Sequence, residues 1–189
     1  LGGLPLSRFH LLGMALHMGT PSSLDVLMRG GRWINGKHYE FGQPVIDEAI
    51  QNLSKDDWDL VSDIWTMMGD RLWKETVALQ KRTGGIVPKR LETRDIETPH
   101  GTVKGGYFPL IAARGQSNVG RKVEESEVIG MATAGISRAT TSKSRLQERT
   151  GAAYPLELNL ETLLTSSVDK VITDISHREF VVQANKVLT

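Results

Sequence analysis

Apolar side chains recur at helical spacing over two long stretches of the chain. In residues 54–82 they follow one another at intervals of three and four, which places them on one face of a helix. Ser54 and Asp57 have capping-box spacing and stand directly before this run, so they predict where the helix begins. The buried stripe of this predicted helix consists of Trp58, Val61, Trp65, Met68 and Leu72.

The second long pattern closes the chain. Asn159 is placed to cap a helix that runs towards Leu188. Leu163, Ile172 and Phe180 widen its apolar side beyond one stripe, and apolar surface of this kind favours packing against other subunits. The predicted stripe itself consists of Leu164, Val168, Val171, Ile175 and Val182.

Shorter patterns predict a cluster of small helices before the first long one. Residues 7–18 form one helix, and a second begins at Ser22 or Ser23 and ends at the following glycine pair. Pro44 begins a third, since proline suits the first turn of a helix. Residues 30–43, rich in glycine and aromatic side chains, are expected to form a loop.

A turn-rich insert, residues 98–114, lies between the two long helices. Pro99 suits the second position of a turn, and Gly101 tolerates the positive φ that closes a short hairpin. Residues 91–98 and 102–110 are the expected arms of this hairpin. The insert is therefore interpreted as a structural device that fixes how the helices meet.

The second half of the insert combines a glycine pair with an aromatic pair. The glycines predict a bulge or a close approach of another backbone, and Pro109 argues against a central strand. The aromatic side chains are expected to pack into neighbouring helices, with docking of a partner as the alternative. The candidate packing or partner contacts are Gly105, Gly106, Tyr107, Phe108, Pro109, Trp58 and Trp65.

Residues 115–151 are polar and weakly patterned, which predicts a long loop with a short helix near 123–131. Basic side chains in this stretch are candidate phosphate contacts, and a solvated loop is the alternative interpretation. These side chains are Arg138, Lys143, Arg145 and Arg149.

Together the patterns predict a mainly α fold. It has two long amphipathic helices plus short helices, a small β-hairpin insert and a long polar loop. Residues 1–189 form a single helical module in this interpretation. The chain opens at Leu1 with the apolar run LGGLPL, so we expect it to be a segment of a much larger polypeptide.

The composition of the chain excludes several kinds of functional site. The net charge is +1, and the chain has no cysteine, which excludes disulfides and thiolate metal sites. No apolar run is long enough to span a bilayer. His10 and His17 have no carboxylate at metal-ligand spacing and are interpreted as partly buried helical side chains. We expect no catalytic residue, no cofactor and no metal, and therefore no enzyme activity in this segment.

Several motifs in this order resemble the internal virion proteins, or DNA ejection proteins, and the related giant polyvalent proteins of tailed phages and prophages. They are ALHMG at 15–19, KDDWDLVSDIW at 55–65, TPHGTVKGGYFPL at 98–110, Ala-Thr-Thr at 139–141 and ITDISHREFV at 172–181. The GGYFPL element is the most specific of them, whereas the helices are generic.

The resemblance implies a non-catalytic structural and assembly module that takes part in genome ejection into the host cell. The implied partners are further copies of the chain in a homo-oligomer and other virion or ejection proteins, with DNA as a further contact. The implied location is the virion, inside the capsid or tail, with delivery into the host cell envelope or cytoplasm. Two alternatives stand beside it, a nucleic-acid-binding module and an accessory domain of a large enzyme whose active site lies elsewhere.

Overall fold

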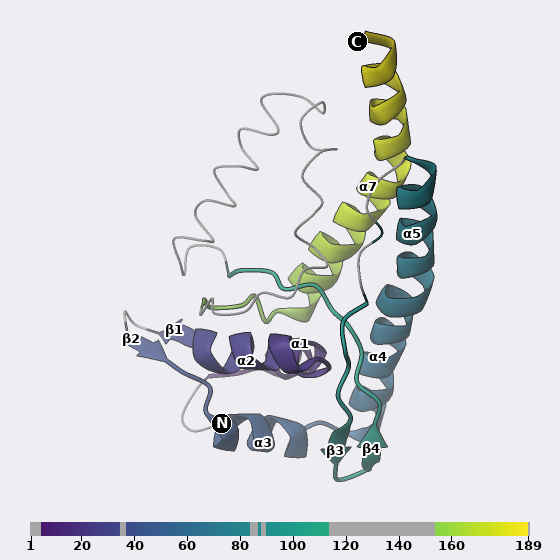
Figure 1. Ribbon diagram of the computed structural model, residues 1–189. Coiled ribbons are helices and arrows are strands. Elements are labelled where there is room, and N and C mark those ends of the chain that lie inside the picture. Colours follow the sequence, from purple (N-terminus) through teal and green to yellow (C-terminus); the bar gives the residue numbers. More distant parts are fainter. Residues whose placement is uncertain (1–4, 35–36, 84–86, 88–89, 114–153, 189) are drawn as a thin grey trace.

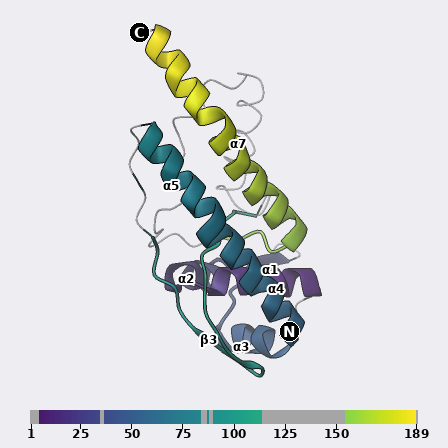
Figure 2. The same ribbon diagram turned by 90° about the vertical axis from the view of Figure 1, so that its right-hand side faces the viewer.

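A computed structural model describes residues 5–34, 37–83, 87, 90–113 and 154–188. Within these ranges the fold is mainly helical, as the sequence predicts, with two small hairpins added (Figure 1). Short helices form a base at one end of the molecule, and two long helical segments rise from it side by side (Figure 2). The expected loop and helix within 115–151 lie outside the described residues.

Three short helices make up the base: α1 (Arg8–Met18), α2 (Pro21–Gly30) and α3 (Gln43–Gln51). The predicted start of α2 at Ser22 or Ser23 is wrong. Thr20 is the N-cap, and its side chain accepts a hydrogen bond from the Ser23 amide at 3.2 Å. Pro21 therefore occupies the first turn, where its missing N–H costs nothing.

The first long helix begins where the capping box predicts. The Ser54 hydroxyl accepts from the Asp57 amide at 3.3 Å, and the Asp57 carboxylate accepts from the Ser54 amide at 3.0 Å. Helix α4 (Lys55–Thr66) follows, and α5 (Trp73–Arg82) ends the run. Of the predicted stripe, Leu72 alone is only half-buried.

A π-helical segment, η1 (Met67–Leu72), joins α4 to α5 and was not predicted. The side chain of Arg90 contacts this π-helical segment. Its guanidinium pairs with the Asp70 carboxylate at 2.8 Å and donates to the Gly69 carbonyl at 3.5 Å. Because a π turn changes the apolar spacing by about one residue, the sequence pattern did not distinguish it from regular helix.

The closing helix, α7 (Leu160–Leu188), starts at the predicted cap, since the Asn159 side chain accepts from the Thr162 amide at 3.2 Å. Helix α7 packs on α1 and α5, and its last turns extend past the end of α5 (Figures 1 and 2). The stripe was predicted to be buried, but the stripe positions whose side chains are described are buried only in part. Leu160 and Leu163 are fully buried, whereas four stripe positions are half-buried: Leu164, Val168, Val171 and Ile175.

Two antiparallel hairpins complete the described fold. Strands β3 (Ile96–Thr98) and β4 (Gly101–Val103) pair at the predicted turn, but with arms of three residues each and not the long arms expected. Gly101 has φ of 115°, which is the positive value that the turn was expected to need.

The other hairpin contradicts the predicted loop at residues 30–43. Strands β1 (Arg32–Ile34) and β2 (Lys37–Tyr39) pair there in an antiparallel ribbon. A sequence signal for it exists, because positions 35 and 36 are Asn-Gly between β-favouring residues, and this dipeptide is a strong hairpin indicator.

One hydrophobic core joins these elements. It lies between α1, α2, α3 and α4, and it is closed by Ile96 of β3 and by side chains from the connecting segments, among them Phe41, Phe108 and Leu158. No helix among the described residues is long and apolar enough to cross a membrane.

Candidate functional site

The glycine pair of the insert, Gly105 and Gly106, is in close contact with other segments of the chain. A Cβ on Gly105 would lie 2.0 Å from the Arg94 carbonyl oxygen and 2.6 Å from that of Gly19. A Cβ on Gly106 would lie 2.3 Å from the Cβ of Trp65. Such distances leave no room for a side chain, so the predicted close approach is confirmed.

The end of α1 meets the insert at the same point. A Cβ on Gly19 would lie 2.2 Å from the Gly106 carbonyl oxygen, and the Gly19 carbonyl accepts from the Arg94 amide at 3.0 Å. The Trp65 indole N–H donates to the Leu16 carbonyl at 3.1 Å. The insert is thus threaded between α1 and α4, and we call this arrangement of Gly19, Gly105, Gly106 and Trp65 the glycine junction.

The aromatic pair after the junction is divided between core and surface. Phe108 is 1% exposed, whereas Tyr107 and Pro109 are half-buried. The Phe108 ring packs edge-to-face on the imidazole of His17, with ring centroids 5.8 Å apart and planes at 72°. The sequence left open whether this aromatic side chain packs in the core or docks a partner, and Phe108 packs in the core.

His17 is an unusual member of the core. It is completely buried, and among the residues that the structure describes neither ring nitrogen has a hydrogen-bond partner within bonding geometry. Burial lowers the pKa of His17 to about 4, and the nearby Glu157 backbone opposes that shift only weakly. The expectation of a partly buried histidine is wrong here, because the insert and the segment before α7 cover the ring.

A second close contact between segments involves Gly13 of α1 and the segment before α7. The Ala113 amide donates to the Pro155 carbonyl at 2.9 Å, and the Glu157 amide donates to the Ile111 carbonyl at 2.8 Å. A Cβ on Gly13 would lie 2.0 Å from the Leu158 carbonyl oxygen. A glycine inside a helical pattern was the available signal for this close approach.

The two tryptophans proposed as packing or partner contacts both lie in the core. Trp58 and Trp65 are buried on α4, so neither is available on the surface of this chain. The candidate phosphate contacts Arg138, Lys143, Arg145 and Arg149 lie outside the described residues.

Close to Trp58, an ion pair links α1 to the start of α4. The Arg8 guanidinium contacts the Asp57 carboxylate at 2.6 Å. Burial works against the Asp57 charge, but hydrogen bonds from Arg8 and Ser54 outweigh it and hold the pKa of Asp57 below its ordinary value. This pair orients the base against the long helix.

Exposed apolar side chains mark two places, of which the sequence indicated the one on α7 and not the one on the first hairpin. Trp33 and Tyr39 lie on the β1–β2 ribbon, and Ile172 and Phe180 lie on α7. Within the described ranges, no group of three or more histidine, aspartate and glutamate side chains is arranged to hold a metal ion.

In comparisons with known proteins, no family model, no curated protein and no solved structure matches the chain.

Replacing Gly106 with alanine is expected to lower the free energy of unfolding by about 1 to 3 kcal/mol, because the new methyl group overlaps the Trp65 side chain. Chemical denaturation followed by circular dichroism measures the loss.

Gly69→Ala is the matched control, since the nearest atom to its Cβ is the flexible end of Arg90 at 3.9 Å. That helical substitution should leave stability unchanged or raise it by up to about 1 kcal/mol. Equal losses in both variants would contradict the close-packed junction.

Proposed function

We propose that this chain is a non-catalytic structural and assembly module of a tailed-phage ejection protein, and that it associates with further copies of itself. The proposal rests on two supports. One is the ordered set of motifs that resembles internal virion proteins. The other is a pair of helices, α5 and α7, that projects from a firmly packed base and leaves apolar side chains exposed.

The apolar surface of α7 is the observation that carries the proposal. Phe180 is 73% exposed and Ile172 is 51% exposed, although both are large apolar side chains. The Arg82 guanidinium contacts the Glu179 carboxylate at 3.3 Å, close to the end of α5. Phe180 follows Glu179 directly in the chain, and the last turns of α7 extend past the end of α5 (Figure 1).

The packing of the base supports an architectural role for this pair of helices. At the glycine junction a Cβ on Gly19, Gly105 or Gly106 would overlap a neighbouring backbone or side chain, so the segments are closely packed there, and interiors packed at native density transmit strain. The base therefore sets the direction in which α5 and α7 project. A module that presents helices at a set angle suits assembly into a ring or channel.

The test is the oligomeric state of the chain in solution. We expect light scattering with size-exclusion chromatography to detect a self-associated species at micromolar concentration. Phe180→Ser and Ile172→Ser should shift it towards the monomer, by about tenfold in the dissociation constant for each lost apolar anchor. Leu60→Ser, at an exposed leucine on α4 (43%), is the control and should leave association unchanged.

Two outcomes would overturn the proposal. One is a monodisperse monomer that also fails to crosslink to other particle proteins. The other is a parent gene that encodes no component of a virion.

A further inference from the structure

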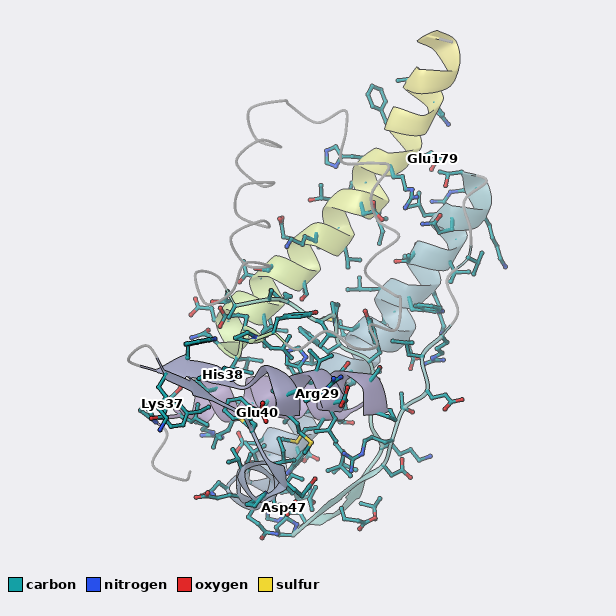
Figure 3. All side chains as sticks on the ribbon, turned by 60° about the vertical axis from the view of Figure 1, so that its left-hand side comes forward. Arg29, Lys37, His38, Glu40, Asp47 and Glu179 are labelled. Carbon is teal, nitrogen blue, oxygen red and sulfur yellow. The ribbon has the colours of Figure 1, made fainter. Side chains whose placement is uncertain are left out.

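The β1–β2 ribbon lies at the edge of the base and is anchored to it at its root. It lies beside the end of α2 and carries Lys37 and His38 (Figure 3). At its root, the His38 imidazole donates from Nε2 to the Gly30 carbonyl at 2.7 Å, and the Phe41 amide donates to the Met28 carbonyl at 2.9 Å. Phe41 itself is fully buried, so the end of the ribbon is anchored in the core.

Two aromatic side chains are exposed on this anchored ribbon. Trp33 is 45% exposed and Tyr39 is 37% exposed. The strand register pairs Trp33 with His38 and Arg32 with Tyr39. Because neighbouring residues of a strand point to opposite faces, each face of the ribbon carries one aromatic ring.

Each ring also has a nitrogen-bearing side chain next to it. The Lys37 ammonium lies 5.2 Å from the centroid of the Tyr39 ring, and the His38 ring lies 5.3 Å from that of Trp33 at a tilt of 41°. The two strands hold no acidic residue. A flat aromatic surface beside positive charge is the combination that binds a polyanion with flat bases.

The division of the aromatic rings between two faces decides the kind of partner. A protein interface has a continuous apolar centre, and a lipid surface takes up a continuous apolar face. Neither is present when the two rings lie on opposite sides of a thin ribbon. A single nucleic-acid strand has bases that can splay apart, so it can contact both sides.

We propose that the β1–β2 ribbon is a contact site for single-stranded nucleic acid. Bases stack on Trp33 and Tyr39, and a backbone phosphate pairs with Lys37. Since the net charge of the whole chain is only +1, attraction comes from this local site and not from a global field. Binding is therefore weak at physiological salt and depends on stacking more than on charge. The site is separate from the exposed surface of α7 and does not rest on self-association.

Fluorescence anisotropy with a fluorescein-labelled oligothymidylate of about 20 nucleotides tests this site directly. With the whole chain at low salt, we expect saturable binding. Trp33→Ala should weaken it by about tenfold or more, and Trp33→Phe should restore most of the affinity because the stacking surface returns. Lys37→Gln should weaken binding and lower the salt slope by about 0.7, the value for one phosphate contact.

Lys55→Gln is the matched charge control, since Lys55 is an exposed lysine already paired with Asp59 on α4, and it should bind like the unaltered chain. Circular dichroism checks that each variant is folded. Absence of saturable binding at low salt would overturn the proposal, and so would unchanged binding by both Trp33→Ala and Lys37→Gln. It would also be overturned if Trp33→Ala reduced binding to vesicles of phosphatidylcholine and phosphatidylglycerol but not to the oligonucleotide.

Discussion

Replacing Phe108 with alanine is expected to lower the free energy of unfolding by about 3 to 5 kcal/mol. The ring is 1% exposed and packs on His17, so its removal takes away buried apolar surface and leaves a cavity beside the glycine junction. The surroundings cannot close that cavity easily, because the neighbouring backbone is already in contact. Urea denaturation followed by tryptophan fluorescence measures the change.

Tyr107→Ala is the matched control for this loss. Tyr107 is adjacent in sequence and of similar size, but it is half-buried, so its removal should cost clearly less than that of Phe108. If the two variants lost equal stability, or if Phe108→Ala lost little, Phe108 would not be a core residue and its place in the interior would be wrong.

Acid is expected to destabilise the fold through His17. The pKa of this histidine is about 4 in the folded chain and 6.5 in a solvated one, so the unfolded chain binds a proton more readily. The neutral side chain thus favours the folded state above pH 6.5, and this contribution is lost as the pH falls from 6.5 to 4. The expected loss approaches about 3 kcal/mol near pH 4.

Unfolding free energies measured by urea between pH 7.5 and 4.5 test this expectation. His17→Leu keeps a similar volume and removes the titrating group, so its stability should vary less with pH by about 2 to 3 kcal/mol over that range. His177→Gln, at an exposed histidine on α7, should retain the full dependence of the unaltered chain. Identical pH profiles for His17→Leu and the unaltered chain would show that His17 is not buried in neutral form.

Local signals in the sequence were sufficient for the helices and the second hairpin turn. The capping box at Ser54 and the cap at Asn159 act within one turn of the chain, and the structure places both where the pattern predicts. Gly101 similarly meets a local backbone requirement. Such signals are readable because the interacting groups are three or four residues apart.

The errors have physical reasons of their own. The π segment at Met67–Leu72 shifts the apolar spacing by too little to be read from residue types. The loop predicted at 30–43 was wrong because each strand of the hairpin has only three residues, which is too short to show the alternation of apolar and polar positions that marks a strand. The stripe on α7 is half-buried because the burial of a helix face depends on how far the neighbouring helices α1 and α5 cover it, which residue spacing does not show.

The candidate sites were predicted less completely than the helices, because the contacts that form them join segments far apart in the chain. The sequence indicated that Gly105 and Gly106 meet another backbone, but it did not indicate that the partners are Arg94, Gly19 and Trp65. It gave no sign that His17 is sealed beneath Phe108, or that Trp33 and Tyr39 remain exposed while Trp58 and Trp65 do not. Sequence neighbours do not separate the two groups, because buried Trp58 lies between two aspartates and exposed Trp33 lies between Arg32 and Ile34.

The sequence by itself determined the helical class and the starts of the long helices, because each follows from contacts within a few residues. The glycine pair of the insert indicated a close approach, but its partners Gly19 and Trp65 lie far away in the chain. Only the tertiary structure decided which aromatic rings are core and which are surface, and what His17 faces. Burial is a property of segments far apart in the chain, and residue spacing within one segment carries no record of which other segment covers it.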